Sequence, residues 1–161
     1  MAVKPVPECF NTVSVYLVVK NAVEALDFYQ KALGAEAGAR MPGPDGKSTM
    51  HAEMRIGNST VMLTDENPQW EMKSPQTIGG SPASLHVYVD DADKLFGRAV
   101  AAGCEVKAPM MDAFWGDRYG KVMDPFGYQW GIATHKEDVP EEEMGTRAAE
   151  WMASMGDCQD N

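Results

Sequence analysis

The chain has 161 residues, of which 44% are hydrophobic and 24% charged, and its formal net charge is −10. This length suits one domain or two small modules with a shared core, and the negative charge argues against nucleic acid or an anionic membrane surface as a partner. Three widely spaced cysteines argue against a disulfide framework, and without a visible leader or an apolar run near ~20 residues we expect a cytoplasmic protein.

The first predicted module covers residues 10–66. Residues 12–19 are rich in β-branched side chains, which predicts a buried strand. A helix follows, because Asn21 and Glu24 form a capping box and Gly34 is a typical C-terminal cap. Three further strands are predicted at residues 35–41, 48–56 and 59–64.

A linker is predicted at residues 67–83, where proline, glycine and polar residues dominate. It contains Trp70, an aromatic side chain that suits two different roles. It either closes over a cleft as a lid or packs across a dimer, and the sequence does not separate these alternatives.

The second predicted module, residues 84–135, repeats the order of the first. A strand at 84–89 leads to a helix between the N-cap Asp91 and the glycine cap Gly103. The strands that follow are predicted at residues 105–111, 117–123 and 128–134. The duplication predicts an α+β fold of two tandem β-α-β-β-β modules.

The last segment, residues 136–161, is acidic and predicts one more helix at 139–155. Pro140 suits the first turn of that helix, and the three glutamates that follow it favour the positive end of the helix dipole. The helix packs on a sheet, crosses a subunit interface or docks a partner protein. These alternatives stay open from the sequence.

Several segments resemble the vicinal oxygen chelate superfamily, which includes glyoxalase I, bleomycin-resistance proteins and extradiol dioxygenases. The stretch from Asp27-Phe28-Tyr29 to Leu33-Gly34 and the turn Asp124-Pro125-Phe126-Gly127 carry this resemblance. Residues 51–57, 114–120 and 133–138 resemble the PhnB-like subgroup. The resemblance implies a curved eight-stranded mixed sheet around a cleft, plus a C-terminal helix, in a homodimer.

Metal-dependent members of that superfamily hold a divalent cation with histidine and glutamate on the first and last strands of each module. The positions that match in this chain are Ser14, Val61 or Met62, Ser84 and Gly131. None offers an imidazole or a carboxylate. The resemblance therefore implies no metal cofactor and favours a protein that binds a hydrophobic or aromatic small molecule, as bleomycin-resistance proteins do.

Candidate site residues lie on the first strand and in one loop of the second module. His86 suits a general base, because the ordinary pKa of histidine is near 6.5, and its alternative is a core histidine bonded to the backbone. The loop offers aromatic rings, a carboxylate and a guanidinium for a flat or anionic ligand, or only an ion pair beside an anchoring tryptophan. The predicted ligand-binding residues are Ser84, Tyr88, Trp115, Asp117, Arg118 and Tyr119.

A rival hypothesis is a metal-dependent lyase, isomerase or dioxygenase with an unusual site. His51 and Glu53 lie two residues apart, so they share a face of their strand. Together with His86 they make a His₂Glu set, which suits Zn, Ni, Mn or Fe. This hypothesis requires the three side chains to converge.

Overall fold

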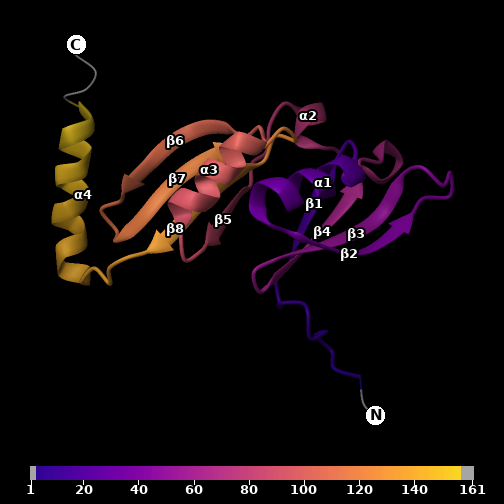
Figure 1. Cartoon of the computed structure of the whole chain (residues 1–161), viewed down its shortest axis with the longest axis horizontal. Coiled ribbons are helices and arrows are strands. Elements are labelled where there is room, and N and C mark those ends of the chain that lie inside the picture. Colours follow the sequence, from indigo (N-terminus) through magenta and orange to yellow (C-terminus); the bar gives the residue numbers. More distant parts are fainter. Residues whose placement is uncertain (1–2, 157–161) are drawn as a thin grey trace.

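The computed structural model describes residues 3–156, which form two β-α-β-β-β modules and a separate C-terminal helix (Figure 1). The first module comprises β1 (Val15–Val19), α1 (Ala22–Leu33), β2 (Glu36–Pro42), β3 (Thr49–Ile56) and β4 (Ser59–Asp65). The second comprises β5 (Ser84–Tyr88), α3 (Ala92–Ala102), β6 (Glu105–Asp112), β7 (Asp117–Met123) and β8 (Gln129–His135). The connection holds η1 (Pro68–Trp70) and α2 (Pro75–Ile78), and α4 (Glu141–Gly156) comes last. The predicted α+β fold with duplicated modules is confirmed.

Each module contributes one four-stranded mixed sheet. The strand orders are β1-β4-β3-β2 and β5-β8-β7-β6, with a parallel pair at β1–β4 and at β5–β8. The eight expected strands are therefore present, but among the described residues the two sheets share no hydrogen-bonded strand pair. The edge strands β1 and β5 lie toward each other at the middle of the molecule (Figure 1).

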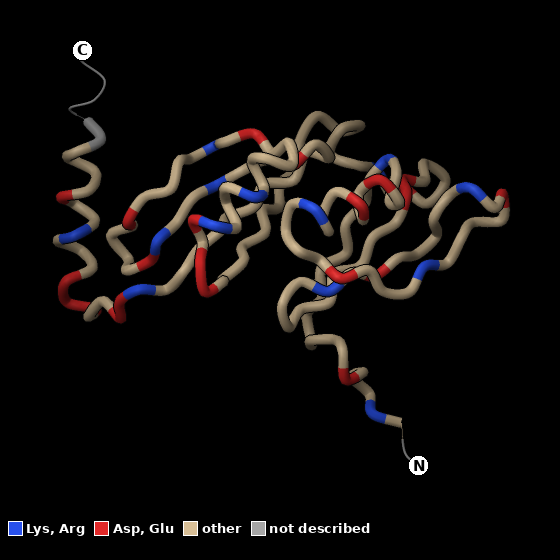
Figure 2. The backbone as a smooth tube through the Cα atoms, in the orientation of Figure 1, with Lys and Arg blue, Asp and Glu red and all other residues tan. Residues whose placement is uncertain are grey.

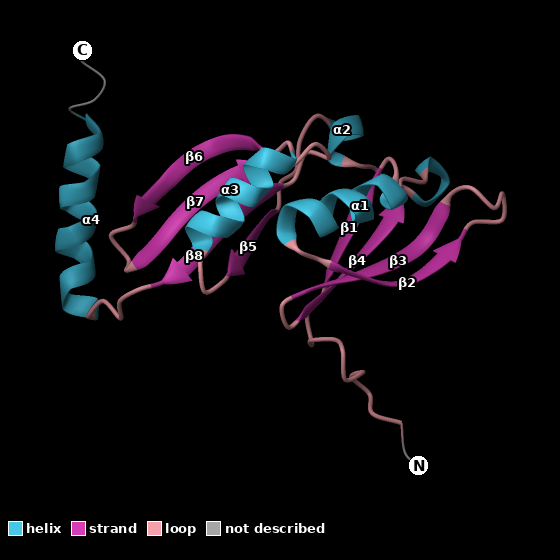
Figure 3. Cartoon of the chain, in the orientation of Figure 1, coloured by secondary structure: helices cyan, strands magenta, loops and turns pink. Residues whose placement is uncertain are grey.

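The helices α1 and α3 contact each other and cover the same side of the two sheets (Figure 3). Both begin at the predicted caps: the side chain of Asn21 accepts from the Glu24 N–H at 3.2 Å, and that of Asp91 accepts from the Lys94 N–H at 2.9 Å. Gly34 ends α1 in the left-handed region with φ of 70°. With both helices on one side, no helix of residues 3–156 covers the opposite side of either sheet, and we call this side the open face.

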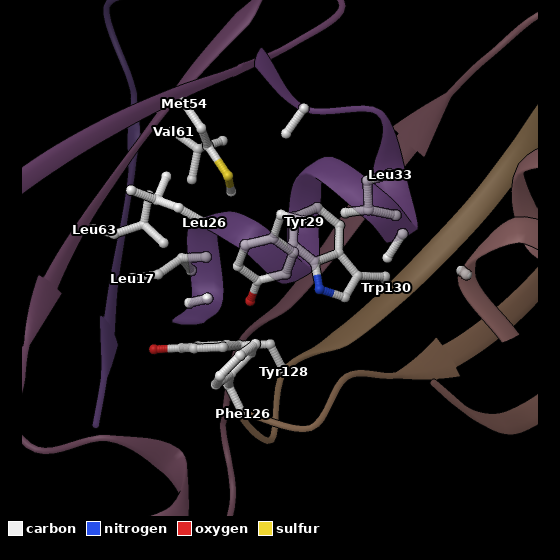
Figure 4. Close-up of a cluster of buried hydrophobic side chains, with 14 of the residues drawn as sticks. Leu17, Leu26, Tyr29, Leu33, Met54, Val61, Leu63, Phe126, Tyr128 and Trp130 are labelled. Atoms are coloured by element: carbon white, nitrogen blue, oxygen red, sulfur yellow. The ribbon is translucent and has the colours of Figure 1, made fainter. Parts of the chain in front are cut away.

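A buried carboxylate joins the two modules in the core. Asp124, 3% exposed, accepts hydrogen bonds from the Tyr29 hydroxyl at 2.7 Å and the Trp130 indole N–H at 2.8 Å. It also accepts from the main-chain N–H groups of Phe126 and Tyr128. Burial raises the pKa of Asp124, and burial together with this carboxylate raises the pKa of Tyr29 well above its usual range. Figure 4 shows the aromatic rings gathered there.

The helix α4 projects away from both sheets (Figure 1). It is held by an aromatic contact between Phe114 and Trp151, with ring centroids 5.6 Å apart, and by the ion pairs of Arg147 with Glu137 and Glu143. Acidic residues gather around its first turn (Figure 2). Within residues 3–156 no helix is long and apolar enough to cross a membrane.

Candidate functional site

The first strand of the second module places its predicted site residues on the open face. Successive side chains of a strand point to opposite sides. Leu85 and Val87 pack against the hydrophobic core, whereas Ser84, His86 and Tyr88 are exposed on the other side. The alternation of side chains along β5 therefore places three of the predicted site residues together on the open face.

Asp117, which is 2% exposed, organises the aromatic side chains of this face. Its Oδ2 accepts from the Tyr88 hydroxyl and from the Trp115 indole N–H, both at 2.9 Å, and its Oδ1 lies 2.8 Å from His135 Nδ1. Burial opposes ionisation of this carboxyl, but the hydrogen bonds from His135, Tyr88 and Trp115 together outweigh it and lower the pKa of Asp117. An ionised carboxylate thus fixes groups from three separate strands or loops.

The aromatic side chains next to this carboxylate form a continuous series of ring contacts. The His86 ring lies nearly parallel to Tyr119, with an interplanar angle of 10° and centroids 5.7 Å apart, and 4.7 Å from the ring of Tyr88. Tyr119 meets Trp115 at 5.4 Å in an edge-on contact. Trp115 contacts Phe114, which reaches Trp151 of α4. We call the rings of His86, Tyr88, Trp115 and Tyr119 the aromatic wall.

A glycine in the central strand makes this stacking possible. Gly131 is paired with His86 on one side and with Lys121 on the other. A Cβ atom at Gly131 would lie 2.8 Å from His86 Nδ1 and 3.0 Å from Tyr119 Cε2. Any larger residue would therefore push these two rings apart.

Arg118 does not join the other predicted residues, which corrects the expectation that it lines the same site. As the neighbour of Asp117 in β7 it points to the opposite face. There its guanidinium binds both carboxylate oxygens of Asp93, at 2.8 and 2.9 Å, and lies 3.4 Å from Asp112. Arg118 thus pairs with Asp93 and Asp112, and Asp117 pairs with His135, in place of the Asp117–Arg118 ion pair that is the alternative from the sequence.

The rival metal set is only partly assembled. His51 Nε2 lies 3.1 Å from Glu53 Oε1 on the open face of the first sheet, beside the ring of Tyr16. His86 packs instead against Tyr88 and Tyr119 of the second module. Across residues 3–156 no three histidine, cysteine, aspartate or glutamate side chains are grouped closely enough to hold one metal ion.

The superfamily's own metal positions also lack suitable donors here. Gly131 has no side chain and its space is filled by two rings. Met62 and Ser84 offer a thioether and a hydroxyl, which are poor ligands for the cations named above. The residues at these positions do not fit a divalent metal ion.

A cavity of about 650 Å³ borders the outer edge of β5, within the volume range of small-molecule sites. The hairpin between β3 and β4 closes it from the first module, where Ile56 and Ser59 contribute. Val15, Val61 and Trp130 add apolar surface. Trp70 lines a different, smaller cavity of about 310 Å³ next to β3 and β4, and its side chain is 57% exposed.

Two residues of the site are not predicted from the sequence. The sequence marks Gly131 only as a position without a metal-binding side chain, and His135 only as part of a segment that resembles the PhnB-like subgroup. His135 lies opposite Asp117 in the β7–β8 pairing. The turn at Asp124–Gly127 was the available signal, because a short turn sets the register of the strands that it joins.

The family described as Glyoxalase/Bleomycin resistance protein/Dioxygenase superfamily matches residues 10–132. An uncharacterized protein of Mycobacterium tuberculosis is 44% identical over 147 residues, covering 89% of this chain and 84% of that protein. The crystal structure of TioX from Micromonospora sp. has a TM-score of 0.61 and 26% identity, covering 78% of this chain and 98% of that one. The PhnB protein of Bacillus cereus has a TM-score of 0.58 at 15% identity, covering 77% and 99%, and shares the fold.

Proposed function

Because this chain belongs to the glyoxalase/bleomycin resistance protein/dioxygenase superfamily, we propose that it binds a flat hydrophobic or aromatic small molecule, without a metal ion, on the aromatic wall. The observation that carries this proposal is the convergence of Tyr88, Trp115 and His135 on the single buried carboxylate of Asp117. These bonds hold the wall in one arrangement before any ligand arrives.

The exposure of the wall supports binding over a purely structural role. Tyr88 is 63% exposed although its hydroxyl is anchored, and His86 is exposed beside it. An exposed aromatic surface gains little for folding, but it stabilises a complex when a flat ligand stacks on it. We assign His86 to this stacking surface, and its role as a general base stays a prediction.

The residues at the family's metal-binding positions support ligand binding without a metal ion. Glycine, methionine and serine stand where metal-dependent relatives carry histidine and glutamate. The rival hypothesis retains the pair His51 and Glu53, which lies in the first module. A decisive experiment therefore has to separate a metal at His51 from a ligand at Tyr119.

The test is a thermal-shift screen of small aromatic compounds in the presence of EDTA, followed by calorimetric titration of the hits. We expect Tyr119→Ala to weaken binding about tenfold, as the loss of one aromatic contact predicts. The matched control is Tyr16→Ala, because Tyr16 holds a similar place beside His51 in the first module. This variant should bind as the parent protein does.

Metal analysis of the untagged protein by mass spectrometry completes the test. Stoichiometric Zn, Ni, Mn or Fe that is lost on His51→Ala would overturn the proposal in favour of the metal-dependent enzyme. Equal affinities in Tyr119→Ala and Tyr16→Ala would also overturn it.

A further inference from the structure

The two modules differ at one pair of equivalent edge-strand positions. In one module a tyrosine side chain bonds to the main chain of the edge strand, and in the other module no side chain of the described residues does. At the edge of β1, the Tyr128 hydroxyl accepts from the Val18 N–H and donates to the Val18 C=O, both at 3.0 Å. The side chain of Tyr128, which follows the β7–β8 turn, thus satisfies two main-chain groups of an edge strand that no neighbouring strand pairs.

The strand pairing identifies the equivalent position in the other module. Tyr16 is paired with Met62, and His86 is paired with Gly131. Val18 lies two residues after Tyr16, as Tyr88 does after His86. Tyr128 lies three residues before Gly131, and Ser59 lies three residues before Met62. Val18 therefore corresponds to Tyr88, and Tyr128 corresponds to Ser59.

A serine is too short to do at β5 what the tyrosine does at β1. The Val89 N–H donates to the Ala133 carbonyl, so the main-chain groups of Tyr88, the preceding residue, point to the outer edge of β5. Ser59 and Tyr88 both line the cavity of about 650 Å³ at this edge. Within the described part of the chain no residue bonds to the main-chain N–H or C=O of Tyr88.

We propose that this cavity binds a small molecule with a phenolic hydroxyl group, which accepts a hydrogen bond from the Tyr88 N–H and donates one to the Tyr88 C=O. The ring of the ligand then lies among the apolar side chains of Val15, Val61 and Trp130. His86 and Tyr88 line this cavity as well as the aromatic wall. The proposed phenol site differs from the wall because its hydrogen bonds go to the main chain of Tyr88.

The shape of the cavity favours a compact ligand over an added peptide strand. The β3–β4 hairpin approaches β5 through Ile56, Gly57, Asn58 and Ser59. A strand pairing with β5 needs a free edge along several residues. A phenol needs only the one donor–acceptor pair that Tyr128 uses at Val18.

The experiment compares 4-ethylphenol with ethylbenzene, which differ by one hydroxyl group. We expect 4-ethylphenol to bind at least about tenfold more tightly in calorimetry, since only its hydroxyl group can pair with the main-chain N–H and C=O of Tyr88. In two-dimensional NMR spectra of the parent protein, 4-ethylphenol should shift the amide resonance of Tyr88. Equal affinities, or an unchanged Tyr88 amide at saturation, would overturn the proposal.

Two variants of Ser59 locate the site. Ser59→Tyr should abolish binding of 4-ethylphenol, because its own ring and hydroxyl occupy the cavity as Tyr128 does in the other module. Ser59→Ala should keep binding. If both variants bind alike, the assignment is wrong. Ser59→Tyr and the Tyr88 amide report on the cavity, whereas Tyr119→Ala reports on the aromatic wall, so the failure of either proposal is recognised separately.

Discussion

At the scale of single residues, two buried carboxylates do different work. Asp124 has all its hydrogen bonds inside the core and links α1 to the β7–β8 turn. Asp117 is as well buried, but it orients side chains that face outward. Asp124 therefore stabilises the packing of the core, whereas Asp117 holds the side chains of the candidate site in place.

We predict that Tyr29→Phe destabilises the protein by about 1–3 kcal/mol. The substitution removes a donor from the buried carboxylate of Asp124 without changing the packing of the ring. Urea unfolding measures the change in the free energy of unfolding. Tyr16→Phe is the control, since the Tyr16 side chain is at the surface and its contacts are 3.4 Å long. Equal effects of the two substitutions would contradict the role of Asp124.

The pair of His135 and Asp117 makes stability depend on pH. Hydrogen bonds to Asp117 and Asp138 raise the pKa of His135 above its ordinary value. A histidine with a raised pKa in the folded state contributes stability below about pH 6.5, and this contribution is lost as the pH rises through the folded-state value. The lowered pKa of Asp117 keeps that carboxylate ionised throughout this range.

We therefore predict that the parent protein is more stable than His135→Asn at pH 5.5, and that the difference narrows toward pH 8.5. Urea unfolding at several pH values measures this difference in the free energy of unfolding between the two proteins. A difference that is constant over this range would show that protonation of His135 does not contribute.

At the scale of elements, β8 determines how closely the aromatic side chains of β5 and β7 approach each other. Its central position in the sheet puts Gly131 between β5 and β7. The absence of a side chain at this one position lets the rings of His86 and Tyr119 approach across the strand. The wall is thus a property of three neighbouring strands.

Gly131→Ala should separate these rings, cost about 1–3 kcal/mol of stability through overpacking, and weaken ligands that stack on the wall. The matched control is Gly145→Ala in α4, where a Cβ atom meets nothing within 4 Å. This control should gain about 1 kcal/mol from helix propensity and leave binding unchanged. Unaltered ligand affinity in Gly131→Ala would show that the ring stack is not part of the site.

At the scale of the whole molecule, the open faces and α4 lack cover from the rest of the described chain. Met152 on α4 is 64% exposed, and Trp151 touches Phe114 at the end of the series of ring contacts. We propose that a second copy of the chain covers this helix in a homodimer, since exposed apolar side chains beside a ligand face are typical of an interface.

Met152→Glu should therefore shift the dimer toward monomer in sedimentation equilibrium, because it buries a charge in the contact. Ala153→Glu adds the same charge one residue along the helix and should have the smaller effect. A parent protein that is monomeric at high concentration would refute the homodimer.

The sequence alone determined the two modules and the order of their elements, and it predicted His86, Tyr88, Trp115 and Tyr119 as site residues. These features depend on local physics: the caps at Asn21 and Asp91, the glycines that end both helices, and the alternation along β5. Only the tertiary structure decided that Arg118 faces away, that His135 joins Asp117, and that Tyr128 reaches Val18 across 110 residues. Such contacts depend on how strands pair and modules pack over long distances, which no local pattern of residues records.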